Sequence, residues 1–240
     1  MTKLFISDLH LDENRPDIAE LFLRFLRENT KDAEALYILG DFFETWIGDD
    51  NLTDFNVMIM EALKTATNQG LPIFISHGNR DFLLGKKFLN ATGCKLLPEE
   101  YVVGCYGTPI LLMHGDTLCT QDRAYLKFRK KVRNYFVQQL FLWKSLAKRK
   151  KIADDYRTKS QKKMSTLPDH IMDVTADEVF NKMQKHGVQH LIHGHTHRQA
   201  IHEFILNNKP ATRTVLGAWH EFGNALVCEN SGKRSFIEIK

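Results

Sequence analysis

Histidine and aspartate residues recur directly after short apolar segments, at spacings that suit metal binding. In the stretch "LIHGHTHR", His195 and His197 are alternate residues, and alternate residues of an extended segment point the same way. Asp8 and His10 repeat this alternation after the first apolar segment. An aspartate, an asparagine and a further histidine follow three more such segments. The candidate metal ligands are therefore Asp8, His10, Asp41, Asn79, His114, His195 and His197.

This set of side chains indicates a pair of metal ions. Two aspartates, four histidines and an asparagine exceed what a single tetrahedral ion accepts, whereas two ions can share a bridging carboxylate. The set contains no cysteine, which argues against a closed structural zinc site. Its mixed nitrogen and oxygen donors allow manganese, iron, cobalt or zinc. A single Asp-x-His is usually only a turn, but several such signals in this order favour a metal site.

The segments that carry these residues predict alternating strands and helices. Short apolar runs end in polar or glycine-containing turns at residues 3–7, 35–39, 71–76, 109–113 and 188–192. Between the early runs lie two helical stripes, Ile18, Leu21, Phe22 and Phe25, then Phe55, Ile59, Leu63 and Ala66. This alternation predicts α/β layering, which places the ligands at one rim, outside the carboxyl ends of the strands. The tail, from residue 202 onward, predicts a β-meander.

Length and composition are those of one globular domain. The chain has 240 residues, of which 43% are hydrophobic and 26% are charged. No apolar run approaches 18 residues and no signal-peptide pattern precedes the first strand, so we expect a cytoplasmic protein without a membrane span. The four cysteines are scattered without a Cys-x-x-Cys pair, which is typical of buried thiols in a reducing compartment.

The segment from Arg123 to Lys163 differs from the rest of the chain in charge. It holds 15 of the 33 Lys and Arg residues but only two acids, a net charge of +13 against −9 for the remainder. Its apolar residues recur at helical spacing, as one predicted stripe of Tyr125, Phe128, Val132, Phe136, Leu140 and Trp143.

This basic segment has several interpretations. It can be a helical hairpin that packs on the core with a solvated basic face. It can also be a cap over the metal rim, whose apolar side receives acyl chains and whose basic residues meet anionic head groups. Nucleic acid is the rival partner, since basic patches with aromatic residues also bind strands. The apolar density of residues 136–143 favours lipid.

The ordered motifs "DLH", "GD", "GNRD", "HGD" and "GHTH" together resemble the calcineurin-like metallophosphoesterases, and the match spans most of the chain. The resemblance implies a four-layer αββα sandwich, an α/β fold that holds two Mn²⁺ ions. One ion would take Asp8, His10, Asp41 and His197. The other would take Asp41, Asn79, His114 and His195, with Asp41 bridging the two.

Further motifs, among them "GDFFETWIGDD", "HGNRDFLLGK", "MHGDTLCT" and "VLGAWH", resemble one branch of this family. Its members cleave the pyrophosphate bond of UDP-2,3-diacylglucosamine in lipid A biosynthesis. The resemblance implies attack of a metal-activated water on the α-phosphorus, which gives UMP and 2,3-diacylglucosamine 1-phosphate (lipid X). It also implies a peripheral place on the cytoplasmic face of the inner membrane, a helical lipid-binding cap over residues 123–167, and no nucleic-acid partner.

Arg80 departs from the broad family, which carries a histidine there as the acid that protonates the leaving group. Arginine stays charged at any working pH and cannot take that role. A phosphate monoester has a second pKa of about 6 and can leave as an anion near pH 7, so a pyrophosphate substrate suits this departure. We expect Arg80 to hold phosphoryl oxygens with two hydrogen bonds.

The resemblance also assigns roles to individual residues. The expected catalytic residues are Asp41, Asn79, Arg80, His114 and His195. The expected substrate-binding residues are Asn79, Arg80, Asp122, Arg157, Ser160 and His195. The sequence departs from the branch at Met164 and Leu167, where its members often carry polar residues.

Two alternatives to the lipid-linked pyrophosphatase stay open. One is a metallophosphoesterase that acts on soluble nucleotides or nucleic acid. The other is a non-catalytic metal-binding scaffold, against which the complete ligand set argues.

Overall fold

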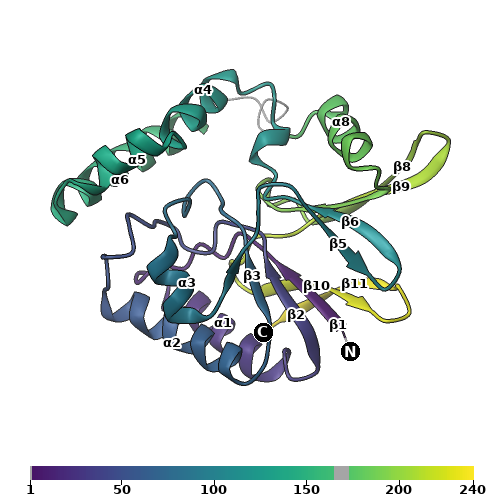
Figure 1. Ribbon diagram of the computed structural model, residues 1–240, viewed down its shortest axis with the longest axis horizontal. Helices are drawn as coiled ribbons and strands as arrows, with labels where there is room; N and C mark the ends of the chain where they lie inside the picture. Colours follow the sequence, from purple (N-terminus) through teal and green to yellow (C-terminus); the bar gives the residue numbers. More distant parts are fainter. Residues whose placement is uncertain (1, 165–172) are drawn as a thin grey trace.

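The computed structural model describes residues 2–164 and 173–240, which form two β-sheets packed face to face with helices on both outer sides (Figure 1). Over these described residues, every helix is too short or too polar to cross a membrane. All four cysteines are buried and free, as their scattered spacing predicted. The order of the layers is helix, sheet, sheet, helix.

The first sheet has the strand order β11-β10-β1-β2-β3-β4. Strands β1 to β4 are parallel to one another, and β10 pairs with β1 in the antiparallel sense. Three helices cover its outer face (Figure 1). The strands are β1 (Thr2–Ile6), β2 (Ala33–Ile38), β3 (Ile73–Ile75), β4 (Lys95–Leu96), β10 (Gly223–Glu229) and β11 (Arg234–Ile239), and the helices are α1 (Pro16–Glu28), α2 (Asp54–Asn68) and α3 (Lys86–Thr92).

The second sheet has the order β5-β6-β7-β9-β8, and helix α8 packs on its outer face. In its middle, β6, β7 and β9 are parallel. Its elements are β5 (Tyr101–Cys105), β6 (Thr108–Leu112), β7 (His190–His193), β8 (Ala200–Leu206), β9 (Lys209–Val215) and α8 (Ala176–His186).

Alternating side chains on each strand build separate cores. In β1, Leu4 and Ile6 pack toward α1 and α2, whereas Phe5 points into the space between the sheets. In β7, Ile192 joins that central core and Leu191 packs toward α8. Because both faces of these strands are covered, they read in sequence as continuous apolar runs. The predicted αββα sandwich is confirmed.

The C-terminal strands do not form the predicted meander. Strands β8 and β9 pair as one hairpin in the second sheet, while β10 and β11 pair as another in the first sheet. The crossing segment carries Trp219, whose side chain is buried beside Phe22 and Phe25 of α1. This buried side chain holds the chain at the first sheet, so the second hairpin pairs with β1 instead of continuing from β9.

Between β6 and α8, the described residues include three α-helices that form a layer above the strand ends, and we call these three the cap (Figure 1). They are α4 (Arg123–Val132), α5 (Tyr135–Leu142) and α6 (Leu146–Met164). The cap is fastened at α6, where the buried Arg149 guanidinium donates to Ile47 O over 2.7 Å and pairs with Asp50. Between α4 and α6, the Phe128 and Tyr156 rings pack with centroids 5.0 Å apart.

The single apolar stripe predicted over the cap is wrong. Asn134 caps the N-terminus of α5 by accepting hydrogen bonds from Phe136 N and Val137 N, and this turn separates α4 from α5. The stripe therefore divides. Its members on α4 face the two-sheet sandwich and α6, while Phe136 and Trp143 point to solvent.

Candidate metal centre

Five of the seven predicted ligands have left-handed backbone conformations. The φ angles are 55° at Asp8, 51° at His10, 49° at Asp41, 68° at His195 and 60° at His197. A non-glycine residue in this region costs about 1–2 kcal/mol. Each lies in the turn that directly follows a strand, and the sharp turn aims the side chain back over the strand ends. The unfavourable angles are thus concentrated where the candidate site lies.

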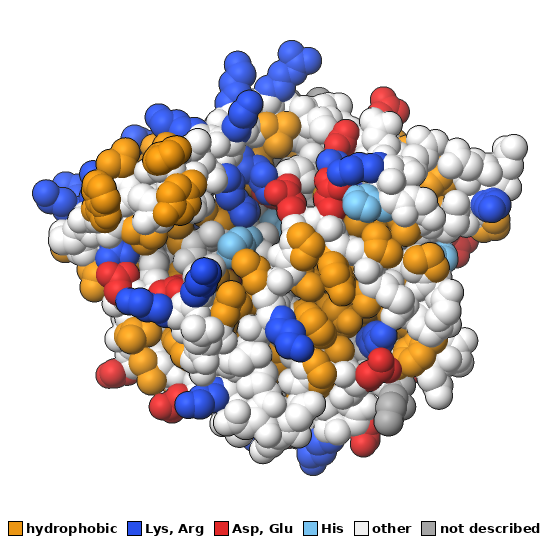
Figure 2. Space-filling view, in the orientation of Figure 1, with side chains coloured by type: hydrophobic (Ala, Val, Ile, Leu, Met, Phe, Trp, Pro, Cys, Tyr) orange, Lys and Arg blue, Asp and Glu red, His pale blue; other side chains and the backbone are white. Residues whose placement is uncertain are grey.

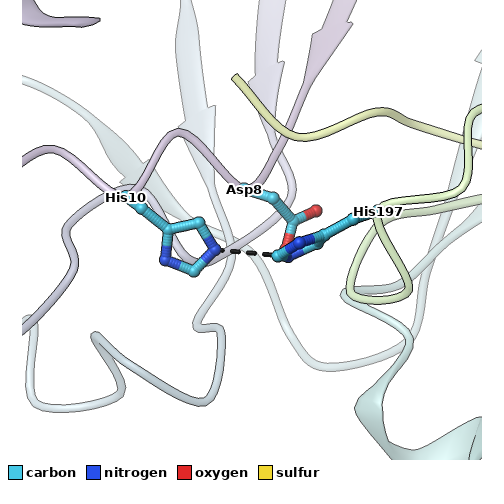
Figure 3. Close-up of side chains that lie close together, drawn as sticks. All are labelled: Asp8, His10 and His197. Atoms are coloured by element: carbon cyan, nitrogen blue, oxygen red, sulfur yellow. Dashed lines mark hydrogen bonds and ion pairs between the residues drawn. The ribbon is translucent and has the colours of Figure 1, made fainter. Parts of the chain in front are cut away.

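One group of predicted ligands consists of Asp8, His10 and His197, whose side chains point toward one another (Figure 3). His10 Nε2 lies 3.3 Å from His197 Nε2, and His197 Nε2 lies 3.3 Å from Asp8 Oδ1. Two donors on one ion, each bound at about 2.1 Å, are roughly 3–3.5 Å apart. The three side chains are therefore spaced as ligands of a common cation.

A second group consists of Asn79, His114 and His195. Asn79 Oδ1 lies 2.9 Å from both His114 Nε2 and His195 Nδ1. These side chains come from the ends of β3, β6 and β7, three strands that are far apart in sequence. The same spacing argument applies, so this group can hold a second cation.

Asp41 lies between the two groups. Its Oδ2 is 3.8 Å from His10 Nε2, and its Oδ1 is 3.7 Å from His114 Nε2. Ligand atoms of Asp8, Asp41 and His114 also lie within 4.8 Å of one another. The structure thus brings all seven predicted ligands to one rim, and the Asp41 carboxylate has one oxygen directed to each group.

Two contacts direct the inward nitrogens of His114 and His10 toward the rim. His114 Nδ1 donates to Leu39 O over 2.9 Å, which keeps the Nε2 lone pair directed at Asn79 and Asp41. His10 Nδ1 lies 2.7 Å from Glu44 Oε2, which orients His10 in the same manner. Carboxylate and carbonyl partners of this kind are the usual outer support of metal-bound histidine.

The residues fit divalent cations in their charge as well as their spacing. Asp8 Oδ1 is buried, and it has no hydrogen-bond partner among the described residues. Burial would raise the pKa of Asp8, but the adjacent His197 imidazole and the neighbouring His114 charge hold it well below its usual range. The pKa of Asp41 is raised, chiefly by burial. A cation between the groups would favour both charged carboxylates.

The histidines also divide in protonation. Burial, then the nearby His114 charge, lowers the pKa of His195 to about 4, so its imidazole is neutral at pH 7 and available as a ligand. For His10, burial acts in the lowering direction. The Glu44 carboxylate, which accepts from His10 Nδ1, and the Asp41 and Asp8 carboxylates outweigh burial and raise the pKa of His10 to about 9.

At two positions the chain approaches an aspartate so closely that only glycine, which has no Cβ, fits. A Cβ on Gly78 would overlap the backbone nitrogen and Oδ1 of Asp41. A Cβ on Gly194 would overlap Asp8 Oδ2 and Ser7 Oγ. These glycines let the loops that carry Asn79 and His195 lie directly against the two aspartates.

Sequence analysis missed Asp81 and Glu44 as supports of the site. Asp81 is fully buried and accepts from Gly78 N over 2.7 Å and Phe42 N over 2.8 Å, so it joins the loop that carries Asn79 to the loop that carries Asp41. The signal for Asp81 was present, since it closes the "GNRD" motif. Glu44 lies within the quoted "GDFFETWIGDD" motif, but its side-chain partners, His10, Arg80 and Arg157, are all distant in sequence.

The predicted substrate-binding residues lie at different distances from the rim. Two of these residues, Arg80 and Arg157, lie near Glu44 at the rim. Arg80 Nη1 is 3.9 Å from Glu44 Oε1, and Arg157 Nε is 3.0 Å from the same atom. Asp122 is the N-cap of α4 and accepts from Tyr125 N over 2.9 Å. Ser160 is exposed near the end of α6. The Met164 side chain and Leu167 lie outside the described residues.

The cap exposes a cluster of large apolar side chains. On α5 and its C-cap, Tyr135 is 66% exposed, Phe136 75%, Leu140 58% and Trp143 81%. Figure 2 shows hydrophobic side chains gathered on the cap, at the upper left of this face, with Lys and Arg side chains around them. Aromatic residues with an apolar body and flanking cations are characteristic of surfaces that meet a membrane interface.

Comparisons with known proteins cover almost the whole chain. The family model of the calcineurin-like phosphoesterases matches residues 1–199. A UDP-2,3-diacylglucosamine hydrolase of Azotobacter vinelandii is 50% identical over 97% of this chain and 96% of its own length. Proteins with the same name are 47% identical in Photobacterium profundum, over 97% of this chain and 95% of the relative, and 51% identical in Escherichia coli, over 93% of each.

Proposed function

Since the chain belongs to the calcineurin-like phosphoesterase family, and within it to the family of the UDP-2,3-diacylglucosamine hydrolases, we propose that it hydrolyses UDP-2,3-diacylglucosamine. The products would be UMP and 2,3-diacylglucosamine 1-phosphate (lipid X), by attack on the α-phosphorus. The observation that carries the proposal is the convergence of all seven ligand side chains on one rim beneath a basic, apolar cap.

In this proposal the first group and Asp41 hold one Mn²⁺ ion, and the second group and Asp41 hold the other. When bound, two divalent ions supply an activated water and neutralise charge on phosphoryl oxygens. Manganese suits a site of imidazole, carboxylate and amide donors without thiolate. The chain itself supplies the orientation of the histidines, through Leu39 O and Glu44, and the fixed distance between the groups.

Arg80 is suited to bind the pyrophosphate. Its Nε is buried, and the part of the chain that the structure describes offers that atom no acceptor. Its Nη1 lies 3.9 Å from Glu44 Oε1, which holds the guanidinium at the rim without a close bond. The free N–H groups can therefore donate to phosphoryl oxygens as negative charge develops there. We assign Asn79 and His195 to both metal and substrate, Asp122 and Ser160 to the glucosamine unit, and Arg157 to its phosphate.

The experiment that tests the proposal is UMP release in detergent micelles with added manganese. UDP-2,3-diacylglucosamine is compared with UDP-N-acetylglucosamine, and manganese with magnesium and zinc. Fast release from the acylated substrate alone supports both the chemistry and the lipid role of the cap. Equal rates would indicate a general nucleotide-sugar hydrolase, and no release from either would turn the search to phosphodiesters, including nucleic acid.

We further propose that the cap seats the protein on the cytoplasmic face of the inner membrane, where it collects its lipid substrate. The exposed aromatic residues of α5 would enter the interface, and the flanking cations would meet anionic head groups. The density of apolar side chains on α5 supports lipid over nucleic acid as the partner, because nucleic-acid surfaces use aromatic residues within a polar groove.

A further inference from the structure

The inner face of α4 carries a row of polar side chains directed at the metal rim. Tyr125, Arg129 and Arg133 are spaced four residues apart, so they share one side of the helix. All three are half-buried, although Lys127, Lys130 and Lys131 of the same helix are exposed. A basic helix whose only role was to face solvent would leave these three side chains exposed.

The first of these residues lies against a ligand. The Tyr125 ring stacks on the His195 ring with centroids 6.3 Å apart and planes 28° apart. Its hydroxyl donates to Asp116 Oδ2 over 2.5 Å. Asp116 is buried and lies two residues after His114. The ring of Tyr125 is therefore held between the loops that carry His114 and His195.

Arg129, one turn further along α4, binds the same Asp116 carboxylate as Tyr125. Its Nε donates to the same Asp116 oxygen over 2.6 Å, and its Nη2 lies 2.8 Å from Glu99 Oε1. The buried Asp116 carboxylate thus has a cationic partner and a neutral donor, both from α4. Such a charge-assisted pair fixes the rotation of the helix about its axis.

Arg133, at the end of α4, reaches the third ligand loop. Its Nη2 donates to Gly78 O over 2.8 Å, and its guanidinium lies 5.1 Å from the centre of the Phe82 ring. Gly78 directly precedes Asn79, and its Cα abuts Asp41. This hydrogen bond therefore sets the position of the peptide that carries Asn79.

We propose that α4 is an outer part of the metal centre, in which Tyr125 and Arg133 are positioning residues for His195 and Asn79. The cap would then control the affinity of the ion held by Asn79, His114 and His195, in addition to its role toward lipid. The inference rests on the proposed two-ion site, and it makes that site incomplete without the cap even for a substrate that lacks acyl chains.

The test is calorimetric titration of metal-stripped, full-length protein with Mn²⁺. The variants are Arg133→Met, which keeps the apolar stem and removes the donor to Gly78, and Tyr125→Leu, which removes the ring and the hydroxyl. Lys131→Met is the matched control, because it deletes an equal charge from the solvent side of the same helix. Circular dichroism and thermal unfolding establish that each variant is folded.

We expect one of the two Mn²⁺ binding steps to weaken about tenfold in Arg133→Met and in Tyr125→Leu, with the other step and the control unchanged. Should Arg133→Met fail to fold, Tyr125→Leu decides alone. Two unchanged binding steps in every folded variant would overturn the inference. Wild-type protein that binds two ions yet releases no UMP would instead refute the proposed substrate and leave this inference intact.

Discussion

The backbone N–H of Arg80 donates a 2.8 Å hydrogen bond to Oδ1 of Asp41. The residue that would clamp the substrate is thus fastened, through its main chain, to the carboxylate that lies between the two ligand groups. Asp81 joins the same two loops from beneath, through Gly78 N and Phe42 N. The loops of β2 and β3 are therefore joined as one unit, so a change at Asp41 would affect both proposed ions and the proposed substrate contact together.

Replacement of Asp41 is expected to abolish turnover. Asp41→Asn keeps the shape of the side chain but removes the charge and one oxygen, so it cannot serve both cations. The measurements are UMP release and metal content per chain after dialysis against Mn²⁺. An active variant that still retains both ions would refute the bridging assignment.

Replacement of Arg80 is expected to affect the transition state without affecting metal content. Arg80→Ala should lower kcat/KM by a factor that corresponds to a loss of about 2–4 kcal/mol of transition-state stabilisation. The donors to phosphoryl oxygens are lost, while the backbone hydrogen bond to Asp41 remains. Arg80→Lys, which restores one charge but not the planar fork, should recover only part of the rate. A wild-type rate in Arg80→Ala would remove this residue from the mechanism.

The buried Asp81 is expected to stabilise the fold of the metal-free protein. Asp81→Asn leaves one of the two backbone donors, Gly78 N or Phe42 N, without an acceptor, which should cost about 1–3 kcal/mol. Urea unfolding of metal-stripped protein measures the loss. The same change at the exposed Asp32 is the control and should be silent. Equal midpoints for the two variants would contradict the structural role of Asp81.

The exposed face of α5 is expected to bind lipid. Phe136→Ser and Trp143→Ser should each weaken partition onto vesicles that contain anionic lipid by about five- to tenfold, because each removes an apolar side chain from the interface. Co-sedimentation measures the effect. Leu52→Ser removes a side chain of similar exposure, 57%, outside the cap and should change nothing. Equal binding by all variants would place the membrane contact elsewhere.

Glu100 is expected to make stability depend on acid pH. Burial raises the pKa of this carboxyl, but hydrogen bonds from Lys182, Lys185 and His186 outweigh it and lower the pKa from 4.5 to about 2. A depressed carboxyl pKa contributes stability above pH 4.5 that is lost as the pH falls toward 2.

Because Glu100 is partly solvated, this contribution should be about 1–2 kcal/mol. The difference in unfolding free energy between wild type and Glu100→Gln should therefore be present at pH 7 and vanish near pH 2. Denaturant unfolding at several pH values measures it. A difference that stays constant across this range would exclude the linkage.

The sequence by itself determined which residues converge on the rim. Each predicted ligand lies shortly after a strand, and parallel strands point their carboxyl ends to one edge, so local pattern was sufficient for His195, His197 and Asp41. The motifs likewise indicated the αββα layers, since strands covered on both faces read as continuous apolar runs.

Only the tertiary structure decided what surrounds these ligands. The strand pattern of the tail is the same for a meander and for two separate hairpins, and buried Trp219 sends β10 to the first sheet. The apolar pattern of the cap does not distinguish Tyr125, which faces His195, from Phe136, which faces solvent. The physical reason is common to these cases. Helix and strand periodicity records which side chains share a face, whereas the partner of that face is set by residues distant in sequence.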